Sequence, residues 1–257
     1  MLDGKPVLTA NHSFVPPNPV AGAGCVLLPS LSDFLSALEP QDRAALLALA
    51  RRKPFKKGAR IFEAGDPASM LYILESGRAK IYKTASSGKE IILWFCFPGE
   101  TFGLAELSRG VERTISAQAV DDSNILCLQK VDFLRFITER PSAALCAIDI
   151  LSARLRRLGQ IFLNMATEDV PLRLARIIMN LANETTQGPC AESRCGDEIC
   201  INITLTHQEI ADMIGASRQT VTTALNDFKR RGTIRWVNHH LHIKTPDILE
   251  RIIRDYG

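Results

Sequence analysis

Short apolar segments alternate with turns over the first half of the chain. Leu71–Leu74, Ala79–Lys83 and Ile91–Phe97 are apolar runs of the length of β-strands. Turn pairs such as Ser76-Gly77 and Pro98-Gly99 break the sequence at intervals of about ten residues between Phe55 and Leu128. Regular short strands predict a small antiparallel β-barrel or jelly roll. Before this region, the apolar positions of residues 30–54 have a helical spacing.

After Pro141 the apolar positions take the period of one long helix. They recur alternately four and three residues apart, at Ala144, Ile148, Leu151, Leu155, Leu158, Phe162 and Met165. A stripe of this period over three heptads is typical of a helix that pairs with a second helix. The alternative is a helix that packs on its own domain. We expect a dimerisation helix over residues 141–166.

The segment Thr206–Val221 has the pattern of a helix-turn-helix. Thr206 followed by Glu209 is a capping box, which predicts the start of a helix. Gly215 stands where that helix must end and the chain must turn. Ser217 is suited to cap a second helix. The predicted buried stripe of the second helix consists of Val221, Leu225 and Phe228.

A predicted hairpin follows the second helix. Ile234–Val237 and Leu241–Lys244 alternate like strands around a loop at Asn238-His239-His240. A helix-turn-helix followed by a hairpin is a winged helix. The segment from Ser217 to Arg235 is also basic, because Asp227 is its one acidic residue.

We expect the start of the second helix to enter the major groove of DNA. Arg and Gln pair with base edges, so Arg218 and Gln219 are the predicted base-reading residues. Ser217 and Thr222 are predicted to position the helix on phosphates. Thr206 completes the candidate DNA-binding set. The alternative is an ordinary helical hairpin with a solvated, charged face.

These patterns predict an α+β fold in four parts. The parts are a flexible N-terminal arm (1–29), an effector-sensing β-barrel domain (30–140), the dimerisation helix (141–166) and a winged helix-turn-helix DNA-binding domain (167–257). The 257 residues are 46% hydrophobic and 23% charged, as in ordinary globular proteins. The formal net charge is only +3, so nucleic-acid binding must depend on a local basic patch.

Features of targeting and redox state point to the cytoplasm. The sequence has no apolar run of the about 18 residues that cross a membrane, and its N-terminus has no secretory signal pattern. We therefore expect a cytoplasmic protein without a membrane partner. The cysteine count, seven, is odd, which favours reduced thiols or metal ligands over a disulfide framework.

The order of barrel, long helix and winged helix resembles the CRP/FNR family. This family includes the cyclic-AMP receptor protein, the fumarate/nitrate reductase regulator and the carbon-monoxide sensor. The matching motifs are Phe62–Asp66, Tyr72–Gly77, Phe97–Gly103 and Ser217–Thr220. The resemblance implies an effector-controlled transcription regulator that binds a palindromic site as a homodimer, usually an activator that contacts RNA polymerase.

One departure from the family concerns the effector site. Members that bind cyclic nucleotides have a Gly-Glu pair, in which Glu holds the ribose, and about ten residues later an Arg-Ser or Arg-Thr pair for the phosphate. Here Gly103 is followed by Leu104, whereas Arg113 and Thr114 match the phosphate end. The resemblance thus implies an effector pocket at Gly103, Arg113 and Thr114. Glu106 lies two residues from the expected carboxylate position, and a structural ion pair of Arg113 is the alternative.

The cysteines are candidate ligands for cofactors other than a cyclic nucleotide. Cys127 resembles the barrel cysteine of the oxygen-sensing members, but only Cys25 lies in the N-terminal arm, and two thiolates do not make a standard iron–sulfur site. The positions of the haem ligands in the carbon-monoxide sensor correspond to Gly103 and Ala105, which have no side chain that can bind iron. A haem would therefore need an unusual ligand from Cys25, Cys96 or His12. The remaining candidates for a metal or redox site are Cys190, Cys195 and Cys200. Cyclic nucleotide, haem and an iron–sulfur cluster all stay open.

An enzyme is not expected. Four of the five histidines lie in the predicted DNA-binding domain, and no phosphate-binding glycine loop or nucleophile elbow is present. The alternative function is a cyclic-nucleotide-regulated signalling module that docks to a protein partner. The winged helix argues against it.

Overall fold

The strands of the first half form two antiparallel sheets that face each other. In the computed structural model, which describes residues 33–106, 112–185, 198–201, 203–238 and 240–255, both sheets have four strands. In spatial order, one sheet contains β1 (Arg51–Phe55), β8 (Ser123–Gln129), β3 (Met70–Ser76) and β6 (Thr101–Phe102). The other contains β2 (Arg60–Phe62), β7 (Ser116–Ala119), β4 (Ala79–Thr84) and β5 (Glu90–Cys96). The predicted barrel or jelly roll is confirmed.

Aromatic side chains from both sheets fill the space between them. The ring of Tyr72 in β3 stacks against Phe102 of β6, with centroids 5.3 Å apart, and against Phe62 of β2, with centroids 5.4 Å apart. All three side chains are buried. Such stacked rings bury large apolar areas and add to the stability of a small barrel.

Three helices cover one end of the barrel. They are α1 (Phe34–Ala37), α2 (Pro40–Leu49) and α3 (Lys130–Glu139), and their side chains Phe34, Leu46 and Phe133 form a buried cluster with the start of the long helix. The helical spacing predicted for residues 30–54 is correct only as far as Leu49. Arg51–Pro54 instead belong to β1, because they pair along β8 from Cys127 to Asn124.

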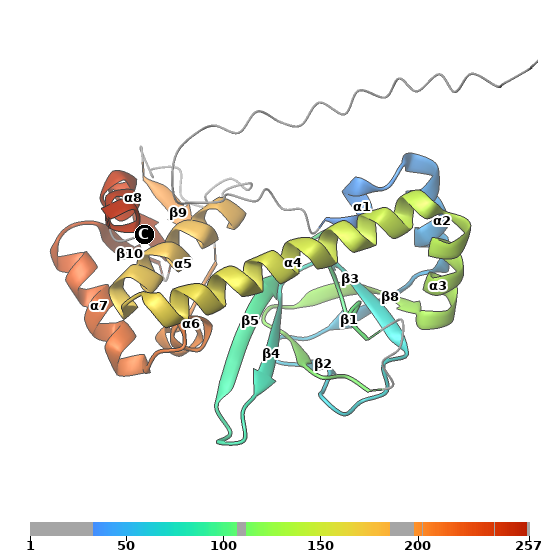
Figure 1. Ribbon diagram of the computed structural model, residues 1–257, viewed down its shortest axis with the longest axis horizontal. Helices are drawn as coiled ribbons and strands as arrows, with labels where there is room; N and C mark the ends of the chain where they lie inside the picture. Colours follow the sequence, from blue (N-terminus) through green and yellow to red (C-terminus); the bar gives the residue numbers. More distant parts are fainter. Residues whose placement is uncertain (1–32, 107–111, 186–197, 202, 239, 256–257) are drawn as a thin grey trace, which may run out of the picture.

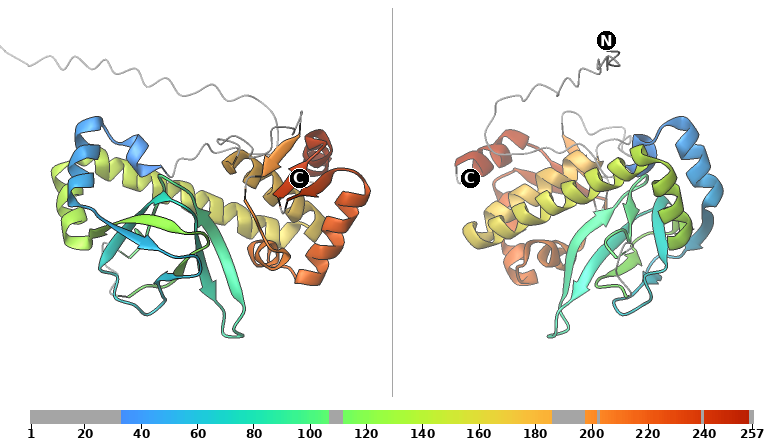
Figure 2. Two further views of the ribbon diagram at one scale, coloured as in Figure 1. Left: turned by 180° about the vertical axis from the view of Figure 1, so that it is seen from behind. Right: turned by 45° about the vertical axis from the view of Figure 1, so that its right-hand side comes forward.

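The long helix α4 (Pro141–Thr167) joins the two parts of the chain (Figure 1). It runs from α1–α3 to the C-terminal elements, as the views in Figure 2 also show. Its buried residues are Ala143, Ala147 and Ile150, which pack on α1–α3. The predicted apolar stripe lies elsewhere on the helix and is open, with Leu155 72% exposed and Phe162 75% exposed.

The C-terminal part is a helical core with a small sheet. It contains α5 (Val170–Thr185), β9 (Ile199–Ile201), α6 (His207–Ile214), α7 (Arg218–Arg230), β10 (Ile234–Val237), β11 (His240–Ile243) and α8 (Pro246–Asp255). The predicted hairpin is confirmed, with Ile234 opposite Ile243 and Val237 opposite His240. Its second strand begins one residue earlier than predicted. Asn238 has a φ of 46°, which suits a tight turn, and His239 lies outside the described residues.

Strand β9 is a feature that the sequence pattern did not predict. It completes a three-stranded sheet by pairing with β11, so that Cys200 lies opposite His242.

Residues 1–29, the predicted arm, lie outside the described part of the chain. The four-part division of the chain stays a prediction. Among the described helices, none has the length and apolar character needed to cross a membrane.

Candidate DNA-binding face and effector site

The first helix of the helix-turn-helix begins as its sequence predicts. The backbone N–H of Glu209 donates to Thr206 Oγ1 at 3.1 Å, and the backbone N–H of Thr206 donates to Glu209 Oε2 at 2.8 Å. The helix ends at Gly215, whose φ is 65°, and the N–H of Ala216 bonds back to the carbonyl oxygen of Ala211 at 3.0 Å. The hydroxyl of Thr206 therefore serves the helix cap first, because it already accepts a backbone hydrogen bond.

The second helix, α7, presents a polar face to solvent. Ser217 caps it by accepting a hydrogen bond of 3.1 Å from the N–H of Thr220. Its other face is buried against α5 and α6 through Val221, Ala224, Leu225 and Phe228. Arg218 and Gln219 are both exposed, as predicted for base-reading residues.

The exposed face of α7 extends beyond the predicted residues. Thr223 and Asn226 are exposed and follow Gln219 at spacings of four and three, so they share one side of the helix with it. The helical period was the signal that would have found them. Together with Arg218, they form the face of α7 that is free to approach a ligand.

Thr222, predicted to contact a phosphate, makes two hydrogen-bond contacts inside the domain. Its hydroxyl donates to the carbonyl oxygen of Arg218 at 2.8 Å and lies 2.9 Å from Nδ1 of His207. A hydroxyl has one hydrogen to donate, and the bond to the Arg218 carbonyl uses it. Thr222 thus ties α7 to the first turn of α6, and its phosphate contact stays a prediction.

The basic patch around α7 is partly neutralised. Asp227 pairs with both Arg230 and Arg231, and Arg235 pairs with Glu198 at 2.8 Å. Within the described part of the chain, no carboxylate lies within ion-pair distance of Arg218 or Lys229. These two cations at opposite ends of α7 are not neutralised, and Asp227 balances only one of the two charges of Arg230 and Arg231.

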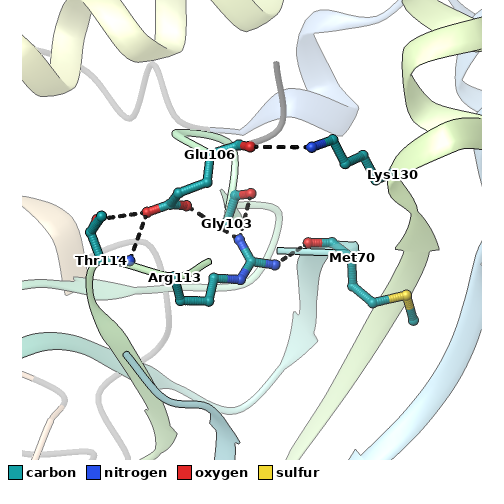
Figure 3. A network of polar contacts seen from close by, with 6 residues as sticks. All are labelled: Met70, Gly103, Glu106, Arg113, Thr114 and Lys130. Carbon is teal, nitrogen blue, oxygen red and sulfur yellow. Dashed lines mark hydrogen bonds and ion pairs between the residues drawn. The ribbon is translucent and has the colours of Figure 1, made fainter. Parts of the chain in front are cut away.

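The predicted effector residues come together, with Gly103 and Arg113 buried and Thr114 exposed (Figure 3). Arg113 is 3% exposed and donates to the carbonyl oxygens of Gly103, at 2.9 Å, and of Met70. Its guanidinium also lies 3.3 Å from Glu106 Oε2. Gly103 has a φ of 80°, and a Cβ there would stand 2.9 Å from Arg113 Nη1. Position 103 thus requires glycine for two reasons, its left-handed backbone conformation and the close approach of the Arg113 side chain.

Glu106 links Arg113 to Thr114. Its Oε1 accepts hydrogen bonds from the Thr114 hydroxyl at 2.8 Å and from the Thr114 backbone N–H at 3.3 Å. Glu106 is 5% exposed. Although Glu106 lies two residues from the expected carboxylate position in the sequence, its carboxylate therefore contacts both Arg113 and Thr114.

Arg113 lies inside the barrel and not at an open rim. Its guanidinium carbon is 4.4 Å from the ring centroid of Phe62 and 5.7 Å from that of Tyr72. The alternative interpretation of Arg113 was a structural ion pair, and Arg113 does form an ion pair with Glu106. Leu104 is buried in the cluster that contains the start of α4, so the position that corresponds to the ribose carboxylate is part of the apolar core.

Cys96 and Cys127, two of the described cysteines, are buried thiols. Cys127 is 5% exposed, its Sγ lies 3.8 Å from the carbonyl oxygen of Ile125, and burial raises the pKa of its thiol. Burial raises the pKa of Cys96 to about 12, with the nearby Glu100 as the second cause. A raised pKa lowers the thiolate fraction, which both metal binding and oxidation require.

The candidate metal and redox sites are only partly within the structure. Cys25, Cys190 and Cys195 lie outside the described residues, as does His12. Cys200 lies in β9 beside His242 of β11. Over the described residues, no group of three or more His, Cys, Asp or Glu side chains is arranged to hold a metal ion. That Cys25 and Cys127 belong to a metal or redox site stays a prediction.

The barrel touches the helix-turn-helix directly. Lys89 Nζ, at the turn between β4 and β5, donates to the carbonyl oxygen of Ala216 at 3.2 Å. Ile92 and Phe95 of β5 belong to the same apolar cluster as Ile214 of α6. The turn residue Gly215 faces Met165 at the end of α4, whose Cε is 3.1 Å from the position that a Cβ would take. The barrel hairpin and the long helix therefore both meet the helix-turn-helix at its turn.

Comparisons with known proteins agree with this architecture. The cyclic nucleotide-binding domain family matches residues 52–140, and the Crp-like helix-turn-helix domain family matches residues 172–252. The chain is 31% identical, over 221 residues, to the "CRP-like cAMP-activated global transcriptional regulator" of Mycobacterium tuberculosis (strain CDC 1551 / Oshkosh), an alignment that covers 86% of this chain and 96% of that protein.

Solved structures show the same fold. FixK2 from Bradyrhizobium japonicum matches with a TM-score of 0.69 at 19% identity, covering 79% of this chain and 96% of that one. A CooA mutant from Carboxydothermus hydrogenoformans matches with a TM-score of 0.66 at 26% identity, covering 81% and 90%. With a barrel, a long helix and a helix-turn-helix all in place, and with a relative of 31% identity along most of its length, this chain belongs to the CRP/FNR family of transcription regulators.

Proposed function

We propose that this protein is an effector-responsive regulator that binds a palindromic DNA site as a homodimer. The observation that carries the proposal is the division of α7 into two faces. Val221, Leu225 and Phe228 are buried against the rest of the domain, while Arg218 and Gln219 are exposed at the start of the helix. A helix fixed in this way can enter a major groove with its first turn leading.

Base reading is assigned to Arg218 and Gln219. An Arg side chain can form two hydrogen bonds with guanine, and a Gln side chain can do so with adenine. Ser217 and Lys229 are proposed to contact phosphates, and Thr206 is proposed to support them by fixing the start of α6. Thr223 and Asn226 extend the base-reading face toward the middle of the site.

The homodimer is assigned to the open stripe of α4. Its large side chains are between 36% and 75% exposed: Ile148, Leu151, Leu155, Leu158, Phe162 and Met165. A contiguous apolar stripe of this length is unfavourable in water and has the heptad period of a coiled coil. Pairing with the same stripe of a second copy would place two α7 helices about one DNA turn apart, which requires two half-sites of opposite orientation.

The effector is proposed to act in the barrel, at Gly103, Arg113 and Thr114. The M. tuberculosis relative is described as cAMP-activated, which makes a cyclic nucleotide the first ligand to test. Leu104 offers no carboxylate to a ribose, so the anionic part of the ligand carries the recognition. The second possibility is a haem with an unusual ligand from Cys25, Cys96 or His12, or a metal or redox site at Cys25 and Cys127 or at Cys190, Cys195 and Cys200. RNA polymerase is the proposed protein partner, and the cytoplasm is the proposed compartment.

The signal is proposed to pass through the contacts at the helix-turn-helix. A ligand shifts a population only if it interacts differently with two arrangements of the protein. The barrel segment Thr101–Leu104 contacts α4, because Arg154 donates to the carbonyl oxygen of Thr101 and Leu104 packs near Ala147. At its other end α4 meets the turn at Gly215. A change in the barrel can therefore alter the position of α7.

The test is a selection of binding sites from a random duplex library with the purified full-length chain. We expect one enriched sequence with two-fold symmetry, bound by a dimer, and calorimetric binding of cyclic AMP or cyclic GMP that changes the DNA affinity. An R218A/Q219A variant is the control for base reading. The proposal fails if no sequence is enriched over the starting library, or if the enriched site lacks symmetry. Metal analysis and visible absorption of anaerobically purified protein test the cofactor alternative.

A further inference from the structure

The barrel holds three hydrogen-bond donors that converge on a single carboxylate. They are the guanidinium of Arg113, 3.3 Å from Glu106 Oε2, and the hydroxyl and backbone N–H of Thr114, 2.8 and 3.3 Å from Glu106 Oε1. Figure 3 shows the carboxylate of Glu106 lying between these two residues. A buried cation with neighbouring N–H and O–H groups is the chemistry of an anion-binding site. In this structure the anion is part of the protein.

The arrangement has the properties of an occupied site. Arg113 and Glu106 are 3% and 5% exposed, so neither charge is compensated by bulk water. Removal of one partner from a buried pair leaves an uncompensated charge, which is strongly unfavourable. An external anion can therefore use the same donors only if the Glu106 carboxylate leaves them, and Arg113 will hold Glu106 until such an anion arrives.

We propose that Glu106 is a built-in counter-anion, which occupies the effector's anionic subsite until a phosphate or carboxylate group of the effector displaces it. The inference rests on the proposed function, because it concerns the regulation of the same site. It also assigns the ligand class: a small anion recognised by Arg113 and Thr114 without a carboxylate clamp at position 104.

Displacement of Glu106 has a direct route to the long helix. Lys130 Nζ lies 3.5 Å from the Glu106 carbonyl oxygen, and Lys130 begins α3. α3 packs on the start of α4, with Phe133 and Phe136 in the same buried cluster as Ala143 and Ala147. A movement of Glu106 thus acts on a helix that contacts the dimerisation helix, which is what a regulatory displacement requires.

The test compares the wild type with E106Q, which keeps the shape of the side chain and removes its charge. Thermal unfolding is followed with increasing inorganic phosphate against chloride at the same ionic strength, and cyclic AMP binding is measured by calorimetry. We expect E106Q to melt at a lower temperature than the wild type without phosphate. We expect phosphate to raise its melting temperature by about 3 °C or more, with little effect on the wild type.

Cyclic AMP, if it is bound, should bind E106Q about tenfold more tightly, because Arg113 is no longer occupied. E106Q/R113Q, without either charge, should lose the response to phosphate. The matched control is E168Q, which breaks the ion pair of Glu168 with Arg176. The two side chains are 2.6 Å apart, and the side chain of Glu168 is 6% exposed. E168Q should show no phosphate response like that of E106Q.

Three results would overturn the proposal. The first is an E106Q protein that folds but responds to neither phosphate nor cyclic AMP. The second is weaker cyclic AMP binding by E106Q, which would make Glu106 a ligand of the effector. The third is an equal phosphate response in E168Q. If E106Q does not fold, E106D replaces it in the test, because its shorter carboxylate keeps the charge but weakens the contacts. E106D should gain less anion affinity than E106Q. An anion affinity that is unchanged or lower than that of the wild type counts against the proposal. A phosphate response without cyclic AMP binding would support the counter-anion and reject only the cyclic-nucleotide class of the proposed function.

Discussion

The ammonium group of Lys89 donates a hydrogen bond of 3.2 Å to the carbonyl oxygen of Ala216. Lys89 belongs to the turn between β4 and β5, and Ala216 to the turn between α6 and α7. The two residues are far apart in the sequence and belong to different domains. Their contact, beside the apolar packing of Ile92 near Ile214, makes the barrel hairpin a support of the helix-turn-helix.

We predict that Lys89→Ala loosens this support. The change removes the charged donor, so the amides of residues 215–218 should exchange with solvent roughly threefold faster, while those of β3 and β8 stay unchanged. Hydrogen exchange read by mass spectrometry is the measurement. Lys83→Ala, an exposed change on the same hairpin, is the control. Equal exchange in wild type, control and variant would show that the hydrogen bond does not hold the turn.

The open stripe of α4 leads to a prediction about assembly. Leu155 and Leu158 are 72% and 36% exposed in the single chain, and charged residues at both positions would place four like charges in a dimer seam. The double variant L155E/L158E should sediment as a monomer and lose specific DNA binding. Leu163→Glu is the control, because Leu163 is 52% exposed on the same helix but lies off the stripe. A stable dimer of the double variant would contradict the assignment of α4.

The buried thiol of Cys96 leads to a prediction about alkaline stability. Burial raises the pKa of Cys96 to about 12 in the folded protein, whereas an unfolded cysteine ionises at a pKa of about 8.5. Because the folded state keeps the proton longer, this thiol contributes stability below about pH 8.5 that is lost as the pH rises toward 12. Chemical unfolding of the wild type should weaken more steeply between pH 9 and 11 than that of Cys96→Ala. Parallel slopes for the two proteins would mean that Cys96 titrates normally.

Local signals in the sequence predicted the helix-turn-helix well. The cap of α6 depends on Thr206 and Glu209, three residues apart, and the turn depends on the backbone freedom of Gly215. Both features need only their nearest neighbours, so a sequence pattern is enough to specify them. The strands of the barrel and the long helix were predictable for the same reason, because apolar runs between turns and a spacing of four and three residues are each a property of one segment.

Features that depend on distant partners were missed. β1 carries four exposed residues, Arg51–Pro54, and has no alternating apolar pattern, so only its pairing with β8 makes it a strand. β9 likewise exists through its pairing with β11. The carboxylate of Glu106 contacts Arg113 and Thr114, seven and eight residues after it. The hydroxyl of Thr222 contacts His207, fifteen residues before it. None of these contacts follows from spacing along the chain.

The exposed face of α7 carries the last prediction. Arg218 is exposed at the first position of the helix, with no carboxylate within ion-pair distance among the described residues, so its guanidinium is available to guanine. Arg218→Ala should weaken binding to the selected site by about 1–3 kcal/mol and relax the preference at one base pair of each half-site. Lys229→Ala, at the other end of α7, should weaken binding to all sequences alike and lower its salt dependence. Fluorescence anisotropy with the selected duplex, with single-base variants and with random DNA separates the two effects. If Arg218→Ala instead lost the same affinity on specific and random DNA, Arg218 would be a phosphate contact, and base reading would rest with Gln219, Thr223 and Asn226.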